Sequence, residues 1–357
     1  MSPRTSPASR IRTLEQLSPY LAASPERLEL LADALQERRL VHSFEVSRGR
    51  RTRMITVPTD EALKHVHRRI VALLTGIATD FPPHVTGYVR GRSTFANALP
   101  HAGSPFMQRF DLADFFGHVT RIGVEQGLIS YGFSENIAPL IARLVSVGGI
   151  LPTGFATSPA MANVAMADFD KDLARLVQEQ DMAVTRYADD IAFSASFPFD
   201  LRERMSGLAE SHGHELNTSK TRTLKHGQPL YVTGLSVAER DGPRLPKPFK
   251  RRVRQELHYI NKFGLVEHSS RTRESPERVV LRLGGRLAYA RSVEAPWVDD
   301  IMAAFPRASS LVFPPRSAES EELKAQSLQR LADRIRSQPA SRAALYTPTV
   351  TYVGMAH

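Results

Sequence analysis

Apolar residues recur at the three- and four-residue spacing of amphipathic helices in several parts of the chain. Ser24 and Pro25 begin the first predicted helix as its N-cap and first-turn residues. The same spacing predicts further helices over 60–79, 121–130, 135–147, 158–179, 201–212 and 319–337. Residues from about 247 onward are also helical in pattern, up to an expected linker at 305–315. Residues 1–23, rich in Ser, Pro and Arg at their start, are expected to be partly disordered.

Shorter apolar runs between these helices predict strands. The runs 41–47 and 54–57, joined by the basic turn 48–51, predict a β-hairpin with a cationic tip. The other expected strands are 106–112, the hairpin pair 182–186 and 191–196, and a pair within 229–238. Because these strands alternate with helices, we expect an α+β fold with helices on one face of a small sheet.

Length and composition narrow the class of protein. A chain of 357 residues can bury a substantial core and is expected to form either one multi-lobed unit or two to three subdomains. It contains no run of about 20 apolar residues and no apolar signal core, so we expect a soluble protein with no membrane partner. The absence of cysteine excludes disulfides and thiolate metal sites, and it fits a cytoplasmic location.

The positive charge is concentrated in two zones. The whole chain carries a formal net charge of +10. Residues 244–291 hold thirteen Lys and Arg residues against four Asp and Glu residues, and residues 38–69 hold nine against three. Either zone alone is explained equally well as a solvated surface. Two such zones on either side of a segment rich in acidic motifs favour a nucleic-acid partner.

Adjacent carboxylates fall at the tip of the predicted hairpin over 182–196. Asp189 and Asp190 lie between its two strands, and Asp111 ends another apolar run. Mg²⁺ prefers carboxylate oxygens together with substrate phosphates. Two metal ions that grip a phosphoryl group need a third carboxylate, which Asp111 supplies. The alternative is that Asp189 and Asp190 belong to an ordinary solvated turn.

Five short motifs occur in the order that reverse transcriptases have them. They are Arg53-Met54-Ile55 with Pro58 and Leu63-Lys64; Phe110 to Phe116; Leu151-Pro152-Thr153-Gly154 with Thr157-Ser158-Pro159 and Asn163; Tyr187 to Asp190; and Gly213 with Leu216-Asn217 and Lys220-Thr221. From about residue 38 to about residue 300 the chain therefore resembles the reverse transcriptases, and among them the bacterial retron enzymes.

Two further matches carry the retron resemblance. Asn97-Ala98-Leu99-Pro100-His101 fits the Asn-Ala-x-x-His signature of these enzymes, and Val232-Thr233-Gly234 fits their Val-Thr-Gly signature. In that family both signatures are associated with a dedicated partner RNA. Each is short enough to occur by chance, as a turn that ends in an ordinary histidine or as a turn after a strand.

The resemblance implies a right-hand polymerase fold. It has fingers, a palm with a small antiparallel sheet and helices, and a helical thumb. We expect an N-terminal helical segment at 1–40, fingers at 41–105 and a palm at 106–245 with a fingers-type insertion near 120–150. A basic helical thumb at 246–304 follows, and then a linker and C-terminal amphipathic helix at 305–357.

The resemblance also implies the roles of individual residues. Asp111, Asp189 and Asp190 are the expected catalytic residues and the ligands of two Mg²⁺ ions. The residues expected to bind the incoming dNTP are Arg53, Phe116, Thr153, Gly154 and Lys220. The residues expected to bind RNA are Asn97, His101, Val232, Thr233, Gly234, Lys250, Arg251, Arg252 and Arg254.

Particular roles are expected for Phe116, Asn163 and Thr153. The Phe116 ring is expected to pack under the sugar and to exclude a ribose 2′-OH, whereas Phe115 is expected in the core. Asn163 is expected to help shape the nucleotide pocket. Thr153 is a departure, because the family usually has Gln there, and we expect it to alter the grip on the nucleotide without removing a metal ligand.

The function implied by the resemblance is RNA-directed DNA synthesis of the retron type. The primer would be a guanosine 2′-OH within a cognate structured RNA, the product a branched RNA–DNA, and the role anti-phage defence. The implied partners are that RNA and its cDNA, an accessory effector protein and host ribonuclease H. Two alternatives remain open: another defence-type or group II intron-like reverse transcriptase, and a non-catalytic RNA-binding protein.

Overall fold

The computed structural model describes residues 11–48, 51–76, 81–178 and 180–312. The chain divides into two compact units, Met1–Pro246 and Lys247–His357. The amphipathic helix expected at 319–337 lies outside the described residues. Within the described residues, no helix is both long and apolar enough to cross a membrane.

The first unit mixes helices with short antiparallel strands, as the α+β prediction requires. Its helices are α1 (Leu14–Leu21), α2 (Pro25–Gln36), α3 (Glu61–Thr75), α4 (Thr94–Ala98), the 3₁₀ helix η3 (Leu99–His101), α5 (Phe115–His118), α6 (Arg121–Ser130), α7 (Ala138–Val145), α8 (Ser158–Ala165), α9 (Ala167–Arg175) and α10 (Arg202–Ser211). Its strands are β1 (Val41–Arg48), β2 (Arg51–Pro58), β3 (Phe106–Asp111), β4 (Met182–Tyr187), β5 (Asp190–Ala195), β6 (Arg222–Lys225), β7 (Tyr231–Val232) and β8 (Leu235–Ser236). The α+β prediction is therefore confirmed.

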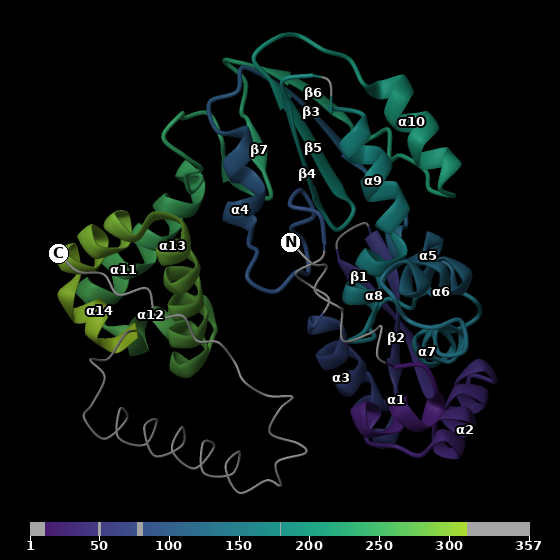
Figure 1. Ribbon diagram of the computed structural model, residues 1–357. Helices are drawn as coiled ribbons and strands as arrows, with labels where there is room; N and C mark the ends of the chain where they lie inside the picture. The colour runs from purple at the N-terminus through teal and green to yellow at the C-terminus, as the bar shows by residue number, and fades with distance from the viewer. Residues whose placement is uncertain (1–10, 49–50, 77–80, 179, 313–357) are drawn as a thin grey trace, which may run out of the picture. The chain divides into compact units, whose positions relative to one another are not determined.

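The central sheet has four antiparallel strands in the order β4-β5-β3-β6. In Figure 1, α9 and α10 lie along one side of this sheet and α4 lies along the other. The expectation of helices on one face is therefore wrong, because α4 and η3 pack on the other face, where His101 contacts Thr185 and Ser194. Successive side chains on a strand point to opposite faces. Asp111 and its register partner Asp190 therefore share one face, and Phe110 and Ile191 share the opposite face.

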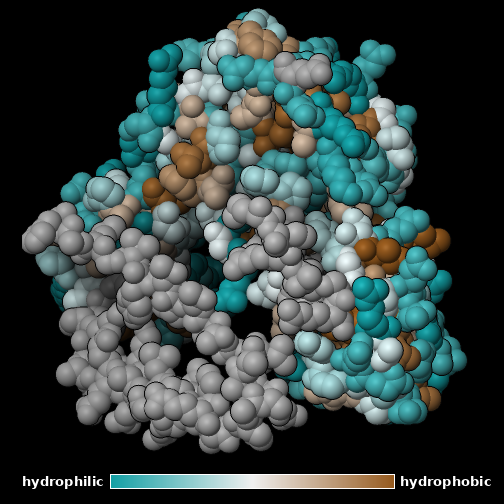
Figure 2. All heavy atoms as spheres, viewed as in Figure 1, coloured by the Kyte–Doolittle hydropathy of each residue, from teal (hydrophilic) through white to brown (hydrophobic). Residues whose placement is uncertain are grey.

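Apolar side chains from many segments meet in one core within the first unit. Leu17, Leu28, Leu63, Phe110 and Phe193 are each at most 1% exposed, and all belong to one cluster. The face in Figure 2 shows small hydrophobic patches separated by hydrophilic side chains. The core therefore joins the N-terminal helices to the sheet that carries the acidic motifs.

The predicted β-hairpin, β1 with β2, forms at the predicted place and is called the fingers hairpin after its expected domain. Side-chain hydroxyls face each other across it, with Ser43 Oγ 2.9 Å from Thr56 Oγ1 and Ser47 Oγ 3.2 Å from Thr52 Oγ1. Thr56 N also donates to the carbonyl oxygen of Thr153 at 2.8 Å. This hydrogen bond fixes the base of the hairpin to the segment that leads into α8.

Three features of the first unit differ from the sequence-based expectation. Helix α1 forms within the segment expected to be partly disordered, because Thr13 and Gln16 make a capping box at its start. The helix expected at 158–179 is two helices, α8 and α9, separated at Met166, whose ψ of 8° leaves the helical range. Strand β6 was not predicted, since its side chains are largely exposed and no apolar alternation marks it.

The second unit is helical throughout its described part. It contains α11 (Lys247–Phe263), α12 (Leu265–Thr272), α13 (Pro276–Ala304) and α14 (Pro306–Val312). Helix α14 occupies most of the expected linker at 305–315, because Pro306 stands at a helix start, where its missing N–H has no cost. Glu256 accepts from Arg282 and Arg286 and so ties α11 to α13.

Three buried histidines are expected to make the first unit less stable in acid. Burial lowers the pKa of His67, His101 and His214 from 6.5 to about 4 each. Because the unfolded chain takes up these protons first, stability is expected to fall as the pH drops from about 6.5 toward 4, by up to about 1.4 kcal/mol per pH unit for each histidine. Urea unfolding between pH 7.5 and 4.5 measures this loss. A midpoint that stays constant over that range would contradict it.

Candidate active site

The three acidic residues meet at one end of the central sheet. The register of β3 with β5 sets Asp111 directly opposite Asp190. Asp189 lies in the two-residue turn between β4 and β5, after Ala188, whose φ of 58° is left-handed. Leu112 N donates to the carbonyl oxygen of Asp189 at 3.0 Å and so ties the two segments beyond the register pair.

A cleft of about 760 Å³ opens beside these carboxylates. It is lined from the fingers hairpin, from the segment after β3, from the loop before α8 and from the β4–β5 turn. Six of the residues predicted from the sequence line it: Arg53, Asp111, Phe116, Thr153, Asp189 and Lys220. The structure thus brings most of the expected catalytic and nucleotide-binding residues to one cavity, although they come from five separate segments.

Basic side chains already contact the carboxylates. Lys220 Nζ lies 2.6 Å from both carboxylate oxygens of Asp111, whose side chain is nearly buried. Arg109 Nη2 lies 3.4 Å from Asp190 Oδ1. Lys220 was predicted to act near the triphosphate, and in this structure it is the counter-charge of Asp111. Arg109 was not predicted, since a lone arginine within a strand carries no motif.

The protonation of the acidic residues reflects their crowding. Burial raises the pKa of Asp189, and the neighbouring Asp111 and Asp190 raise it further, against the effect of Lys220. Burial likewise raises the pKa of Asp190, and Arg109 opposes that rise. Negative charges held together and partly removed from water are stabilised by a cation.

The acidic residues carry the charge that a divalent metal ion requires. Among the described residues, no group of three His, Asp or Glu side chains converges as a preformed metal-ligand set. Both carboxylate oxygens of Asp111 instead contact Lys220 Nζ. Carboxylate oxygens on a rigid strand end and an adjoining turn are nevertheless suitable ligands for a hard cation.

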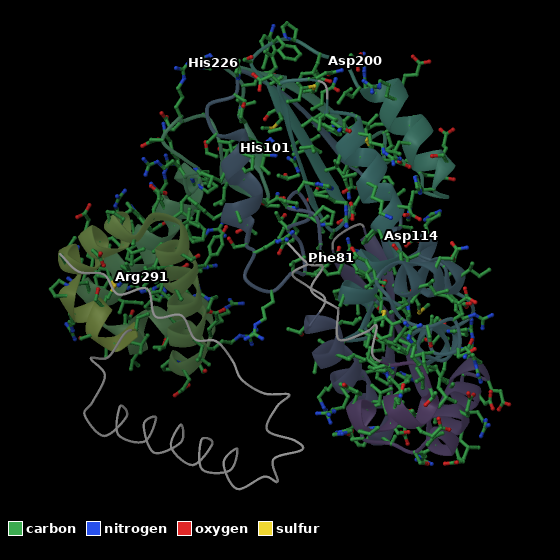
Figure 3. The ribbon with its side chains drawn as sticks, viewed as in Figure 1. Phe81, His101, Asp114, Asp200, His226 and Arg291 are labelled. Atoms are coloured by element: carbon green, nitrogen blue, oxygen red, sulfur yellow. The ribbon has the colours of Figure 1, made fainter. Side chains whose placement is uncertain are left out.

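Residues 114–117 all line the cleft. Phe116 lines the cleft and is half-buried, whereas Phe115 is buried in the core. Asp114 (labelled in Figure 3) precedes α5 with a left-handed φ of 39°, and its side chain does not cap the helix. A Cβ on Gly117 would lie 2.1 Å from Asp114 Oδ2, so a larger residue there would require the Asp114 side chain to move.

Thr153 and Gly154 hold the fingers hairpin rather than reach deep into the cleft. The Thr153 carbonyl accepts the hydrogen bond from Thr56 N, and only Thr153 of the two lines the cleft. Gly154 has a φ of 122°, and a Cβ on it would lie 2.6 Å from the Thr56 carbonyl oxygen. Gly154 is therefore explained by close backbone approach.

The two retron signatures lie next to each other but inside the protein. Asn97 and His101 are at most 2% exposed, and His101 is labelled beside α4 in Figure 3. His101 contacts two hydroxyls, with Nδ1 2.8 Å from Ser194 Oγ and Nε2 2.8 Å from Thr185 Oγ1. Asn97 Nδ2 donates to Thr233 Oγ1 at 3.4 Å. These side chains point inward, so direct RNA contact through them has no support in the structure.

The Val-Thr-Gly segment supports that packing. Val232 is buried, and Thr233 Oγ1 donates to the carbonyl oxygen of Thr94 at 3.1 Å. Thr233 and Gly234 form the turn between β7 and β8 with φ values of 46° and 82°. Segments more than 130 residues apart are thus joined into one surface, whose binding of RNA stays a prediction.

The basic residues predicted on α11 differ in their surroundings. Lys250 contacts Glu294 Oε1 at 2.7 Å and lies 5.5 Å from the Trp297 ring centroid, so it is held within the second unit. Arg251, Arg252 and Arg254 are exposed. Only these three of the four α11 residues present their charge to solvent, which is what backbone contacts to RNA require.

Comparison with known proteins identifies the type of domain. Residues 48–260 match the family model described as reverse transcriptase (RNA-dependent DNA polymerase). The chain is 34% identical over 218 residues to the retron Mx65 reverse transcriptase of Myxococcus xanthus, which covers 55% of this chain and 50% of that protein. It is 32% identical over 243 residues to the retron Mx162 enzyme of the same organism, covering 58% and 49%. It thus spans about half the length of these two relatives.

A third curated relative is covered more fully. The chain is 27% identical over 268 residues to the retron Ec86 reverse transcriptase of Escherichia coli, which covers 72% of this chain and 82% of that protein. Among solved structures, telomerase of Candida albicans aligns with 12% identity and a TM-score of 0.44 over 86% of this chain and 64% of that one. A TM-score below 0.5 carries no argument about function.

Proposed function

This chain belongs to the reverse transcriptase (RNA-dependent DNA polymerase) family, and from that premise we propose that it is an RNA-directed DNA polymerase of the retron type. The observation that supports the activity most directly is the meeting of Asp111, Asp189 and Asp190 beside a cleft lined by Arg53 and Phe116. The similarity to retron enzymes supports the subtype.

In this proposal the three carboxylates hold two Mg²⁺ ions. Bound metal lowers the pKa of the attacking hydroxyl and neutralises charge on the phosphates. Arg53 offers the triphosphate a planar guanidinium fork from the fingers hairpin. Lys220 would supply a second cation, since it lines the same cleft as Arg53. Phosphoryl transfer needs such positioning and charge stabilisation more than a covalent partner.

The parts of the right hand are assigned on the same basis. We assign the fingers to 41–105, the palm to 106–245 and the thumb to 246–304. The thumb assignment is supported by the composition of the second unit, whose described helices carry exposed arginines. The expected substrates are dNTPs and a structured RNA, with a guanosine 2′-OH as primer and branched RNA–DNA as product. An effector protein, host ribonuclease H and a role in defence complete the proposal.

Expression of the gene with its native flanking DNA tests the proposal. After RNase treatment of the extracted nucleic acid, a discrete short single-stranded DNA is expected on a denaturing gel. It should be absent with the Asp189→Asn/Asp190→Asn variant. A mobility shift after 2′,5′-debranching supports the retron subtype, whereas an unchanged band assigns priming to another route.

The purified protein separates the catalytic from the non-catalytic alternative. On poly(rA) primed with oligo(dT), dTTP incorporation in the presence of Mg²⁺ is expected without the cognate RNA. RNA binding without incorporation, with either Mg²⁺ or Mn²⁺, would favour an RNA-binding protein and contradict the proposed activity.

Replacing Phe116 tests the expected exclusion of ribonucleotides. Phe116→Ala removes the ring that faces the cleft and is expected to reduce the preference for dNTP over NTP by about 10- to 100-fold, the range that pocket shape supplies. The measurement is the ratio of kcat/KM for dTTP and UTP. Phe116→Tyr keeps the bulk and is the matched control. An unchanged ratio in Phe116→Ala would remove the discriminating role from this ring.

A further inference from the structure

We propose that Arg186, buried directly behind the Tyr187–Asp190 turn, is a positioning residue that sets the geometry of the catalytic carboxylates. The inference rests on the proposed function, because it concerns the efficiency of the same site. It arises from a buried set of hydrogen bonds that joins Arg186 to Asp170, Asn163 and the turn itself.

Arg186 makes four side-chain hydrogen bonds inside the protein. Its Nε and Nη2 atoms donate to the two carboxylate oxygens of Asp170 on α9, each at 2.6 Å. Nη2 also donates to Asn163 Oδ1 on α8 at 3.1 Å, and Nη1 donates to the carbonyl oxygen of Ala188 at 3.1 Å. The Arg186 side chain is 0% exposed and the Asp170 side chain 1%. The planar fork of arginine suits this bidentate contact, which lysine cannot reproduce.

The bond to Ala188 acts on the turn that carries Asp189. Ala188 is a non-glycine residue with a left-handed φ of 58°. Such a conformation persists only where surrounding contacts hold it. Its carbonyl is held by Arg186 Nη1, so the guanidinium fixes the peptide between Ala188 and Asp189.

Asn163 and Gly87 close the arrangement from the other side. Asn163 Nδ2 donates to the carbonyl oxygen of Gly87 at 2.7 Å. A Cβ on Gly87 would lie 2.6 Å from Ala188 N, so the backbone at Gly87 packs directly against the turn. Gly87 N and Thr86 N both approach the Arg186 carbonyl, at 3.4 and 2.9 Å. Asn163, expected to shape the nucleotide pocket, thus supports the turn from behind.

The position of Arg186 on β4 separates it from the chemistry while keeping it next to the site. Thr185 and Tyr187 flank it, and because side chains alternate along a strand, both point to the face opposite to Arg186. The register pair Tyr187 with Asp190 places that opposite face on the side of the carboxylates. Arg186 can therefore affect the reaction only through the backbone of the turn.

An ion pair that only stabilises the fold can be distinguished from one that also positions the turn. Removing one partner of a buried pair leaves an unpaired charge and destabilises the fold, whereas replacing both partners by apolar residues of similar volume is often neutral. The double variant Arg186→Met/Asp170→Leu therefore restores packing without restoring the bond to Ala188. Stability and catalysis separate in this variant only if Arg186 has a positioning role.

The experiment measures the melting temperature together with kcat and KM for dTTP on poly(rA) primed with oligo(dT). Asp170→Asn is expected to lower the melting temperature by on the order of 10 °C. The double variant is expected to melt above Asp170→Asn, although Ala188 O and Asn163 Oδ1 lose their donor. It is expected to lose about 100-fold in kcat, with KM little changed, since misplacement by about 1 Å has that cost. Arg186→Lys is expected to have a melting temperature between those of Asp170→Asn and the double variant.

Wild-type kcat in the double variant would overturn the inference and leave Arg186 a structural residue. Should the double variant not fold, Gly87→Ala provides the second test, because its Cβ displaces the turn without burying an unpaired charge. It is expected to lose about 100-fold in kcat, and wild-type kcat would again overturn the inference. Gly207→Ala on α10, where a Cβ meets nothing within 4 Å, is the matched control. An inactive wild type would instead contradict the proposed function.

Discussion

Replacing Asp190 by Asn is expected to lower the rate of DNA synthesis by about 10³-fold or more while leaving RNA affinity within about twofold. The carboxamide has nearly the shape of the carboxylate but lacks its charge. Metal ions held by such carboxylates supply several kcal/mol of transition-state stabilisation, and each 1.4 kcal/mol is a factor of ten in rate. Asp190 lies opposite Asp111 in the register of β3 and β5, so the substitution removes one of two carboxylates that lie side by side.

The measurement is single-nucleotide incorporation on a primed homopolymer, with RNA binding followed separately by filter retention. Asp168→Asn on α9 is the matched control, since its side chain is 71% exposed and pairs with Lys171 on the surface. Exposed pairs of this kind contribute little. Synthesis by Asp190→Asn at the rate of the control would show that the catalytic residues have been assigned wrongly.

Replacing His101 by Ala is expected to lower the free energy of unfolding by about 3 kcal/mol. The change leaves a cavity and removes the partner of two buried hydroxyls, Ser194 Oγ and Thr185 Oγ1. Urea unfolding at pH 7.5 gives the loss directly. RNA affinity per folded molecule should be unchanged, because the His101 ring is 0% exposed.

His65→Ala provides the comparison for this prediction, since His65 is exposed on α3 and its removal should leave stability within about 0.5 kcal/mol. The opposite pattern for His101→Ala, full stability with lost RNA binding, would make His101 an RNA contact. It would then require His101 to leave its buried position when RNA binds.

Local patterns in the sequence were sufficient to predict the carboxylates. The hairpin that carries Asp189 and Asp190 and the strand that ends at Asp111 are short segments, each with a composition that indicates a strand or a turn. Their meeting was inferred from the family resemblance, and the register of β3 with β5 gives its geometry. The fingers hairpin was likewise predicted from two apolar runs and a basic turn.

Contacts between distant charged residues were beyond the reach of the sequence. Arg186 and Asp170 are separated by 16 residues, and each is a charged residue of the kind usually found on the surface. Lys220 lies 109 residues from Asp111, and nothing local indicates their ion pair. A charged side chain is usually exposed, so burial of a pair is visible only once the elements are placed.

The two signatures illustrate a second limit. A short pattern such as Asn97 to His101 indicates relationship, but it does not distinguish a side chain that faces a partner from one that faces the core. Asn97 and His101 are polar, so an RNA contact was the natural expectation. In the structure both are buried, and His101 joins η3 to β4 and β5; the binding of RNA by these residues stays a prediction.

The order of strands in the central sheet governs when the site can exist during synthesis of the chain. β3 is made first but lies between β5 and β6, so Arg109 and Asp111 meet partners 81 and 109 residues later. Contacts of such sequence separation form slowly and late. On a ribosome, β3 therefore emerges with both edges unpaired, a state prone to wrong association. A nascent chain that ends before the β4–β5 turn has only Asp111 of the three acids, so the acidic site is completed only as the sheet assembles.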